Sequence, residues 1–153
     1  MPNWCNNRVT IYSDTPNQIE KIEKIFSDKK NIFGKIIEEP DWRRLPNEKG
    51  EFSKLEQHKN PKTGEVMFET YNFPDGKNDD RWYDWNITNW GTKWDITVKS
   101  VEFGYEDDEQ LEMEFETAWA PPEPICNRLR EMFDDIHVSW FYDEPGMEFA
   151  GYL

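Results

Sequence analysis

Residues 111–119 alternate between apolar and charged side chains, and this pattern constrains the fold more than any other in the chain. One set of alternate positions is largely apolar and consists of Leu111, Met113, Phe115, Thr117 and Trp119. The other set is acidic and consists of Glu112, Glu114 and Glu116. Successive side chains of a strand point to opposite faces of its sheet. The pattern therefore predicts a strand in a sheet that is buried on one face and open to water on the other.

Further strands and two helices are predicted from their own periodicities. Alternation predicts a strand at residues 8–12. The capping-box sequence Thr15-Pro16-Asn17-Gln18 predicts a helix that continues to about Lys29. A second helix is predicted to follow the prolines near residue 121, with a buried row of Ile125, Leu129, Met132 and Phe133. Strands are then expected at 136–142 and at 147–152.

The middle of the chain is less regular. A strand is predicted at 96–105, with a bulge because its apolar phase switches between Val98 and Val101. Before it, Arg81–Asn89 reads as a short helix, with Gly91 just beyond its end. From residue 31 to residue 80 the periodicity fails, and prolines and glycines recur. We expect an insertion with short elements of its own, including a strand at 65–71.

The order of these elements predicts the fold class. Strand, helix, insertion, strand, strand, helix and strand is typical of the α+β ferredoxin-like split β-α-β sandwich. We therefore expect a single ferredoxin-like domain over residues 1–153, with an antiparallel sheet of strand order 4-1-3-2 and two helices on one face. The insertion, residues 31–80, would lie between the first helix and the second strand.

This topology brings four segments rich in tryptophan and asparagine to one pole of the sheet, namely residues 3–7, 89–95, 117–122 and 143–146. The candidate ligand-binding residues at this pole are Trp4, Asn6, Asn89, Trp90, Lys93, Trp94 and Trp119. A small planar, nucleotide-like ligand would stack on Trp90 or Trp94, and Lys93 would neutralise its phosphate. In the alternative interpretation, the same rings form a structural plug beneath the insertion. The sequence is compatible with both.

The net charge of −14 limits the partners of the chain. Direct contact with a nucleic-acid backbone or with an anionic membrane requires lysines and arginines, so both are excluded. A basic host protein remains as a partner, bound by an acidic surface that mimics nucleic acid. The beginning of the sequence has no apolar run, which predicts neither a signal peptide nor a membrane span. Two cysteines, Cys5 and Cys126, suit a reducing compartment, so the expected location is the cytoplasm of a host cell.

Catalytic chemistry is not indicated by any motif. Neither a zinc-ligand spacing nor a phosphate-binding loop is present. His58 and His137 are far apart in sequence, and Cys5 has no predicted basic neighbour. Three in-line glutamates on one strand lie about 7 Å apart and do not form a cation cage. We therefore expect a non-enzymatic protein without a metal or cofactor.

Three motifs resemble the YubB ferredoxin-like family of small proteins carried by bacteriophages, plasmids and genomic islands. The motifs are Met1-Pro-Asn-Trp-Cys-x-Asn, Asn89-Trp-Gly-Thr-Lys-Trp-Asp, and Phe115-x-Thr-Ala-Trp-x-Pro-Pro with Glu144-Pro-Gly. The resemblance covers nearly the whole chain and is loosest between residues 31 and 80. It implies a ferredoxin-like fold and an accessory role on a mobile element, such as counter-defence. It implies no settled activity and no catalytic residues.

Overall fold

The computed structural model describes residues 2–153, and the chain divides into two compact units. The sheet unit comprises the residues up to Glu38 together with Asn86–Leu153. The hairpin unit comprises Glu39–Trp85. The predicted insertion is thus divided, because residues 31–38 belong to the sheet unit. At its other end, the boundary falls within helix α3 (Arg81–Asn89), which has the bounds that the sequence predicts.

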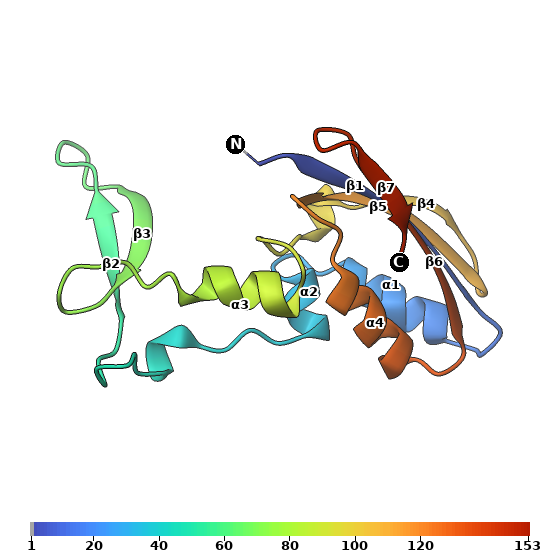
Figure 1. Cartoon of the computed structure of the whole chain (residues 1–153), viewed down its shortest axis with the longest axis horizontal. Helices are drawn as coiled ribbons and strands as arrows, with labels where there is room; N and C mark the ends of the chain where they lie inside the picture. Colours follow the sequence, from blue (N-terminus) through green and yellow to red (C-terminus); the bar gives the residue numbers. More distant parts are fainter. Residues whose placement is uncertain (1) are drawn as a thin grey trace. The chain divides into compact units, whose positions relative to one another are not determined.

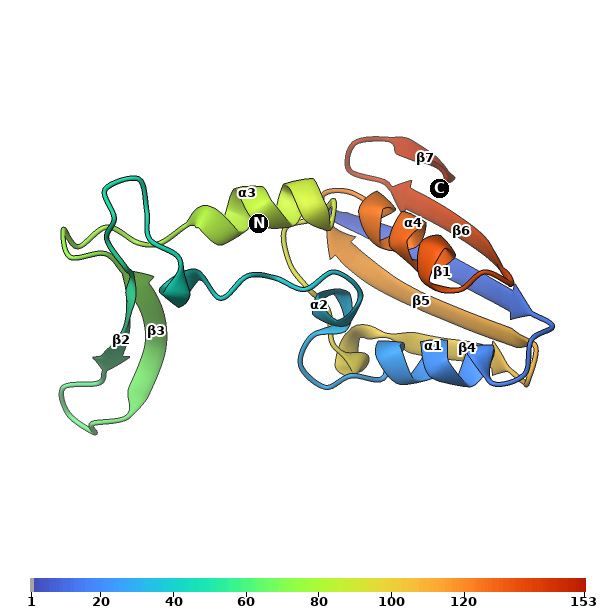
Figure 2. The same cartoon turned by 90° about the horizontal axis from the view of Figure 1, so that it is seen from below.

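The sheet unit is built on a five-stranded antiparallel sheet (Figure 1), whose strand order is β4-β5-β1-β6-β7 (Figure 2). The bounds are Glu102–Glu106 for β4, Gln110–Ala118 for β5, Trp4–Ser13 for β1, Ile136–Glu144 for β6 and Phe149–Tyr152 for β7. Strand β1 is central and pairs along most of its length with β5 on one side and β6 on the other. The predicted α+β architecture with an antiparallel sheet is confirmed.

Three helices cover one face of this sheet, and they are α1 (Gln18–Phe26), α2 (Ile32–Ile36) and α4 (Glu123–Met132) (Figure 2). The core lies between these layers and is centred on the ring of Phe115. That ring is 5.6 Å from Trp140, 6.0 Å from Phe26 and 6.2 Å from Phe33, measured between ring centroids. The apolar alternation of β5 thus supplies the buried face of the sheet, as predicted.

The opposite face of the sheet, which we call the open face, carries the predicted glutamates. Cross-strand partners lie on the same face, and the register pairs Glu112 with Thr10, Glu114 with Arg8 and Glu116 with Asn6. Glu114 and Glu116 are exposed and Glu112 is half-buried. The acidic set of β5 therefore faces away from the helices.

The predicted strand at 96–105 is wrong over its first half. Residues Val98–Ser100 form a 3-10 turn, and the strand begins only at Glu102. The backbone of this segment pairs with the connection between α1 and α2 instead of with the sheet. Ile32 N–H donates to the Ile96 carbonyl (3.0 Å), and Val98 N–H donates to the Asp28 carbonyl (2.8 Å). The switch of apolar phase marks this turn, and helix α2, which the sequence did not predict, packs beside it.

The helix ends also differ from the prediction. Helix α1 begins at Gln18 after Asn17, whose φ is +70°, so the capping box does not form. The Thr15 hydroxyl instead donates to the Asp135 carboxylate (2.7 Å). In α4 the buried residues are Ile125, Cys126 and Leu129, whereas Met132 is exposed. Met132 lies in the last turn, where the helix ends before Phe133 and its side chain reaches solvent.

The hairpin unit contains strands β2 (Lys54–Lys59) and β3 (Val66–Asn72) and a 3-10 turn, η1, at Trp42–Arg44. Its organising residue is Arg81, which donates twice to Asp79 (2.8 Å each) and once to the Trp42 carbonyl (2.8 Å). These charge-assisted bonds hold the pKa of Asp79 below its usual range. The predicted strand at 65–71 corresponds to β3, whereas its partner β2 was too polar in sequence to be recognised.

Across residues 2–153, no helix combines the length and the apolar character needed to cross a bilayer.

Candidate functional site

The four segments that were expected to meet at one pole do converge in the sheet unit. Trp4 pairs with Ala118 at the end of β1, and the Trp119 N–H donates to the Asn3 carbonyl (2.8 Å). The Thr92 hydroxyl donates to the Ala118 carbonyl (2.8 Å), which attaches the segment after α3 to the end of β5. Gly146 lies against Asn3, since a Cβ built on it would be 2.8 Å from Cγ of that residue. We call this region the tryptophan pole.

Trp90 is a packing residue of this pole. Its side chain is 2% exposed, and its ring lies 6.2 Å from that of Phe33. The indole N–H donates to the Ile37 carbonyl (2.9 Å), so the one polar group of the ring has a backbone partner. Trp90 thus lies in the core, away from any surface on which a ligand could stack.

Asp95 is likewise structural. Its carboxylate accepts hydrogen bonds from the backbone N–H groups of Phe33 (2.6 Å), Gly34 (2.9 Å) and Ile96 (2.7 Å). It therefore satisfies donors at the first turn of α2 and fixes the chain that follows Trp94. Burial raises the pKa of this carboxyl, while the three backbone donors act in the opposite direction.

Two other tryptophans of the pole form an exposed pair, which we call the indole ledge. The rings of Trp4 and Trp94 are 6.1 Å apart, and the two side chains are 43% and 39% exposed. The Lys93 Nζ lies 4.5 Å from the centre of the Trp94 ring, within the range of a cation–π contact. Asn6 follows Trp4 at the next position of β1 on the open face and is exposed.

The remaining two predicted residues are Asn89 and Trp119. Asn89 is in the last turn of α3 and is half-buried. Trp119 does not continue the buried row of β5, because the strand ends at Ala118 and Trp119 has a φ of +73°. Its side chain is 44% exposed. A left-handed conformation is costly for a bulky residue, and here the bond from its N–H to Asn3 accompanies the turn.

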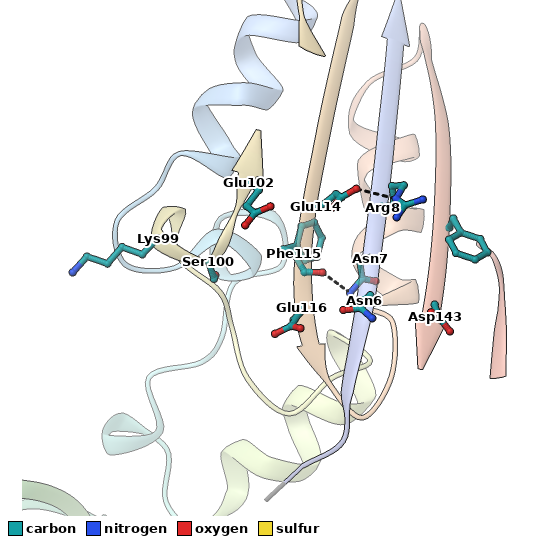
Figure 3. Close-up of a pocket in the computed structure, with 11 residues that line it drawn as sticks. Asn6, Asn7, Arg8, Lys99, Ser100, Glu102, Glu114, Phe115, Glu116 and Asp143 are labelled. Carbon is teal, nitrogen blue, oxygen red and sulfur yellow. Dashed lines mark hydrogen bonds and ion pairs between the residues drawn. The ribbon is translucent and has the colours of Figure 1, made fainter. Parts of the chain in front are cut away.

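A groove on the open face begins beside Asn6 (Figure 3). Its volume is about 620 Å³, and its polar lining includes Asn6, Arg8, Lys99, Glu102, Glu114, Glu116 and Asp143. Phe141 lines it from β6. The Arg8 Nε donates to Glu114 across the strands (2.9 Å), as the dashed line in Figure 3 marks. Sequence reasoning missed Arg8, Phe141 and Asp143, because only the register of β1 with its two neighbours brings them together.

Groups that could perform nucleophilic chemistry are buried or separated. Cys5 is fully buried, and burial raises the pKa of its thiol to about 11, so the thiol is protonated at neutral pH. Both cysteines are free. His58 stacks on Phe68 in the hairpin unit, with ring centroids 4.3 Å apart, whereas His137 lies on β6 beside Tyr12. Among residues 2–153, no histidine, cysteine and carboxylate side chains gather in a group that could hold a metal ion.

The fold and the open face define a ferredoxin-like α+β protein with an acidic sheet surface, and comparison with known proteins identifies its family. The family model described as "Ferredoxin-like domain in Api92-like protein" matches residues 70–153. This is more than half of the chain, and the chain belongs to this family.

A solved structure supports the same fold. The chain is similar to protein api92 from Yersinia pseudotuberculosis, with a TM-score of 0.52 and 12% sequence identity. The similarity covers 99% of this chain and 93% of that one. No curated protein matches the sequence. At this identity the comparison establishes the fold and leaves function to be argued from the residues.

Proposed function

We propose that this chain is a non-enzymatic protein that binds a basic host protein through the open face of its sheet unit. The observation that carries the proposal is the groove of Figure 3, around which Glu102, Glu114, Glu116 and Asp143 gather from three strands. Carboxylates grouped in this way attract a basic surface over a distance of about a Debye length and select against acidic partners. The net charge of −14 acts in the same direction.

The ion pair between Arg8 and Glu114 in the groove is weak enough for a cation of a partner to replace Arg8. The side chains of Arg8 and Glu114 are 71% and 54% exposed. An exposed pair of this kind contributes only about 0–1 kcal/mol to stability. A lysine or arginine of a partner can therefore replace Arg8 beside Glu114 at little cost.

The indole ledge extends this surface, since Trp4 is adjacent to Asn6, a lining residue of the groove, on the same face of β1. Tryptophan is enriched among the residues that dominate binding energy at protein interfaces. A guanidinium group stacks favourably on an indole ring. The neighbouring carboxylates of Glu116 and Asp143 favour such a cation and disfavour a phosphate at the same place.

The biological context of the proposal comes from the resemblance to the YubB family. It supports an origin on a phage or another mobile element and an accessory role, such as counter-defence, in the cytoplasm of a host cell. A protein of this kind would block a basic, nucleic-acid-binding host protein by occupying its basic surface.

The proposal is tested by reversing two charges on the open face. The double variant Glu114→Lys, Glu116→Lys is expected to capture at least about tenfold less basic protein from a bacterial lysate than the wild type, which corresponds to about 1.4 kcal/mol. Capture by the wild type should also weaken steeply as salt is raised. Quantitative mass spectrometry of the captured proteins measures both effects.

The matched control carries the same change of net charge on the helix side. Glu131→Lys with Asp134→Lys alters two exposed residues near the end of α4. This control should retain capture within about twofold of the wild type. Equal losses in both double variants would mean that net charge alone attracts the captured proteins, and the proposal would be wrong.

A second candidate function is the binding of a small planar, nucleotide-like ligand at the tryptophan pole. The observation that favours it is the exposed ring of Trp94 with the Lys93 ammonium group 4.5 Å from its centre. A base would stack on the ledge formed by Trp4 and Trp94, and Lys93 would face its phosphate.

Nucleotide binding predicts saturable quenching of tryptophan fluorescence when mononucleotides and cyclic nucleotides are titrated. Trp94→Ala should then weaken binding by roughly 1–3 kcal/mol, because one stacked base loses its platform. Lys93→Ala should weaken it as well, whereas Lys99→Ala, which removes a lysine of the groove, should leave it unchanged. If nucleotides did not quench the fluorescence of the wild type, this candidate function would be eliminated. The proposal that the open face binds a basic protein would be unaffected.

A further inference from the structure

The two edges of the five-stranded sheet differ in how they are protected. Strand β4 forms one edge, carries Glu102 and Glu106, and pairs with β5 through a register shift. Charges and irregular pairing of this kind discourage the addition of another strand. Strand β7 forms the other edge, and its sequence Phe-Ala-Gly-Tyr contains neither charge nor proline. It pairs with β6 over four successive residues without a shift. Strand addition is therefore disfavoured at the β4 edge, whereas the β7 edge is regular and uncharged.

The hydrogen-bond pattern shows which backbone groups of β7 point outward. The Leu153 N–H donates to the Trp140 carbonyl (3.0 Å), so this N–H is directed toward β6. In an antiparallel pair this direction alternates along the strand. The N–H and C=O groups of Ala150 and Tyr152 are consequently directed away from β6, toward the open edge of the sheet.

The side chains beside this edge suit a basic segment. Ala150 pairs across the strands with Asp143, and Tyr152 pairs with Phe141, so all four lie on the open face. The side chain of Ala150, which lies between the edge and Asp143, is only a methyl group. Tyr152 is 73% exposed, and its ring lies 5.3 Å from that of Phe141. A lysine or arginine opposite Ala150 would reach the Asp143 carboxylate, and one opposite Tyr152 would lie over an aromatic ring.

We propose that β7 is a strand-addition site, on which an extended segment of the partner binds antiparallel as a sixth strand with lysine or arginine at alternate positions. Main-chain hydrogen bonds to Ala150 and Tyr152 supply part of the affinity, and the basic side chains face Asp143 and the two rings. The inference rests on the proposed function for the basic character of the partner. It adds the edge and the register by which that partner is held.

A second copy of this chain is a poorer occupant of the same edge. Strand β7 offers four residues for pairing. The area that a pair of such short strands buries is much smaller than the roughly 1,200–2,000 Å² that stable protein interfaces bury. Two chains of charge −14 also repel each other. Charge complementarity therefore favours a basic segment.

The test uses short capped peptides in which arginine alternates with valine. In the proposed register, the arginines are opposite Ala150 and Tyr152, so their backbone N–H groups face β7, whereas those of the valines face outward. Methylation of the arginine backbone nitrogens is expected to weaken binding at least about tenfold, because these hydrogen bonds are lost. Methylation of the valine nitrogens should change binding less than about threefold. The two methylated peptides have equal charge and composition, so each is the control for the other.

A protein variant tests the same edge from its other side. Ala150→Pro removes an outward N–H, which an edge strand tolerates, and it should weaken the unmethylated peptide at least about tenfold. Ala150→Ser, which keeps the N–H, should bind like the wild type, and circular dichroism checks that both variants are folded. The inference would be overturned if the peptide did not bind, or if the two methylated peptides bound equally well. It would also be overturned if only methylation of the valine nitrogens weakened binding, or if the protein dimerised in sedimentation experiments.

These outcomes are separate from those of the proposed function. If protein capture depended on Glu114 and Glu116 but the two methylated peptides bound equally well, the proposal of binding through the open face would be kept. The proposal of strand addition at β7 would then be rejected. If peptide binding depended on Ala150 and reversing the charges of the two glutamates had no effect, strand addition at β7 would be kept. Binding through the open face would then be rejected.

Discussion

Replacing Phe115 with alanine is expected to lower the free energy of unfolding of the sheet unit by about 3–5 kcal/mol. Phe115 is 4% exposed and lies at the centre of the core. Its ring contacts three others, those of Phe26, Phe33 and Trp140. Removing it takes away buried apolar area and leaves a cavity that the rigid neighbouring rings cannot readily fill. Equilibrium urea unfolding followed by far-ultraviolet circular dichroism measures the loss.

The control for this prediction is Phe149→Ala, which removes the same group in the same unit from a side chain that is 37% exposed. Its cost should be within about 1 kcal/mol, since little buried area is lost. A loss below about 1.5 kcal/mol for Phe115→Ala would contradict the placement of that ring at the contact between the helices and the sheet.

The fold was predictable wherever side-chain alternation reports burial directly. Strand β5 could be recognised because Met113 and Phe115 alternate with glutamates, and its burial follows that pattern. The predicted antiparallel α+β architecture has been observed for the same reason. In these segments local sequence and tertiary burial agree, as they do in sequences with little frustration.

Prediction failed where the chain is held by partners distant in sequence. The segment 96–101 looks like a strand, but its backbone bonds to residues 28 and 32. Helix α2 is only five residues long, and its first turn is capped by Asp95, more than sixty positions away in sequence. Neither feature has a local signature. The prediction for Trp119 failed for a different reason, because the positive φ of this residue ends the alternation of β5 one residue early.

The candidate site was predictable in position and not in detail. Topology alone brings the tryptophan segments to one pole, but it does not show which ring faces inward. Trp90 is buried because its indole reaches the Ile37 carbonyl, whereas Trp94 remains exposed against Trp4. The acidic groove depends on register, since Arg8 and Asp143 belong to strands that are adjacent in the sheet and distant in sequence.

The tryptophan pole itself is tested most directly at Gly91, where substitution by alanine is expected to cost about 2–5 kcal/mol. Gly91 has a φ of +80°, which disfavours any residue with a Cβ. A Cβ at this position would lie 2.8 Å from Cδ of Pro124 and 3.2 Å from the Glu123 nitrogen. Both atoms belong to the rigid start of α4, so the clash cannot be relieved by rotation of a flexible side chain.

The matched control is Gly34→Ala, in the same unit and within α2. A Cβ there would approach the Asn31 side-chain nitrogen at 2.9 Å, which is the end of a flexible side chain that can move, and the Asp95 Oδ2 at 3.3 Å, which requires a shift of only a few tenths of an ångström. Alanine also favours a helix over glycine by roughly 0.5–1 kcal/mol, so the net change should lie within about 1 kcal/mol of zero. Urea unfolding measures both variants. If Gly91→Ala proved as mild as Gly34→Ala, the segment after Trp90 could not pack against the start of α4, and the tryptophan pole would have to be arranged differently.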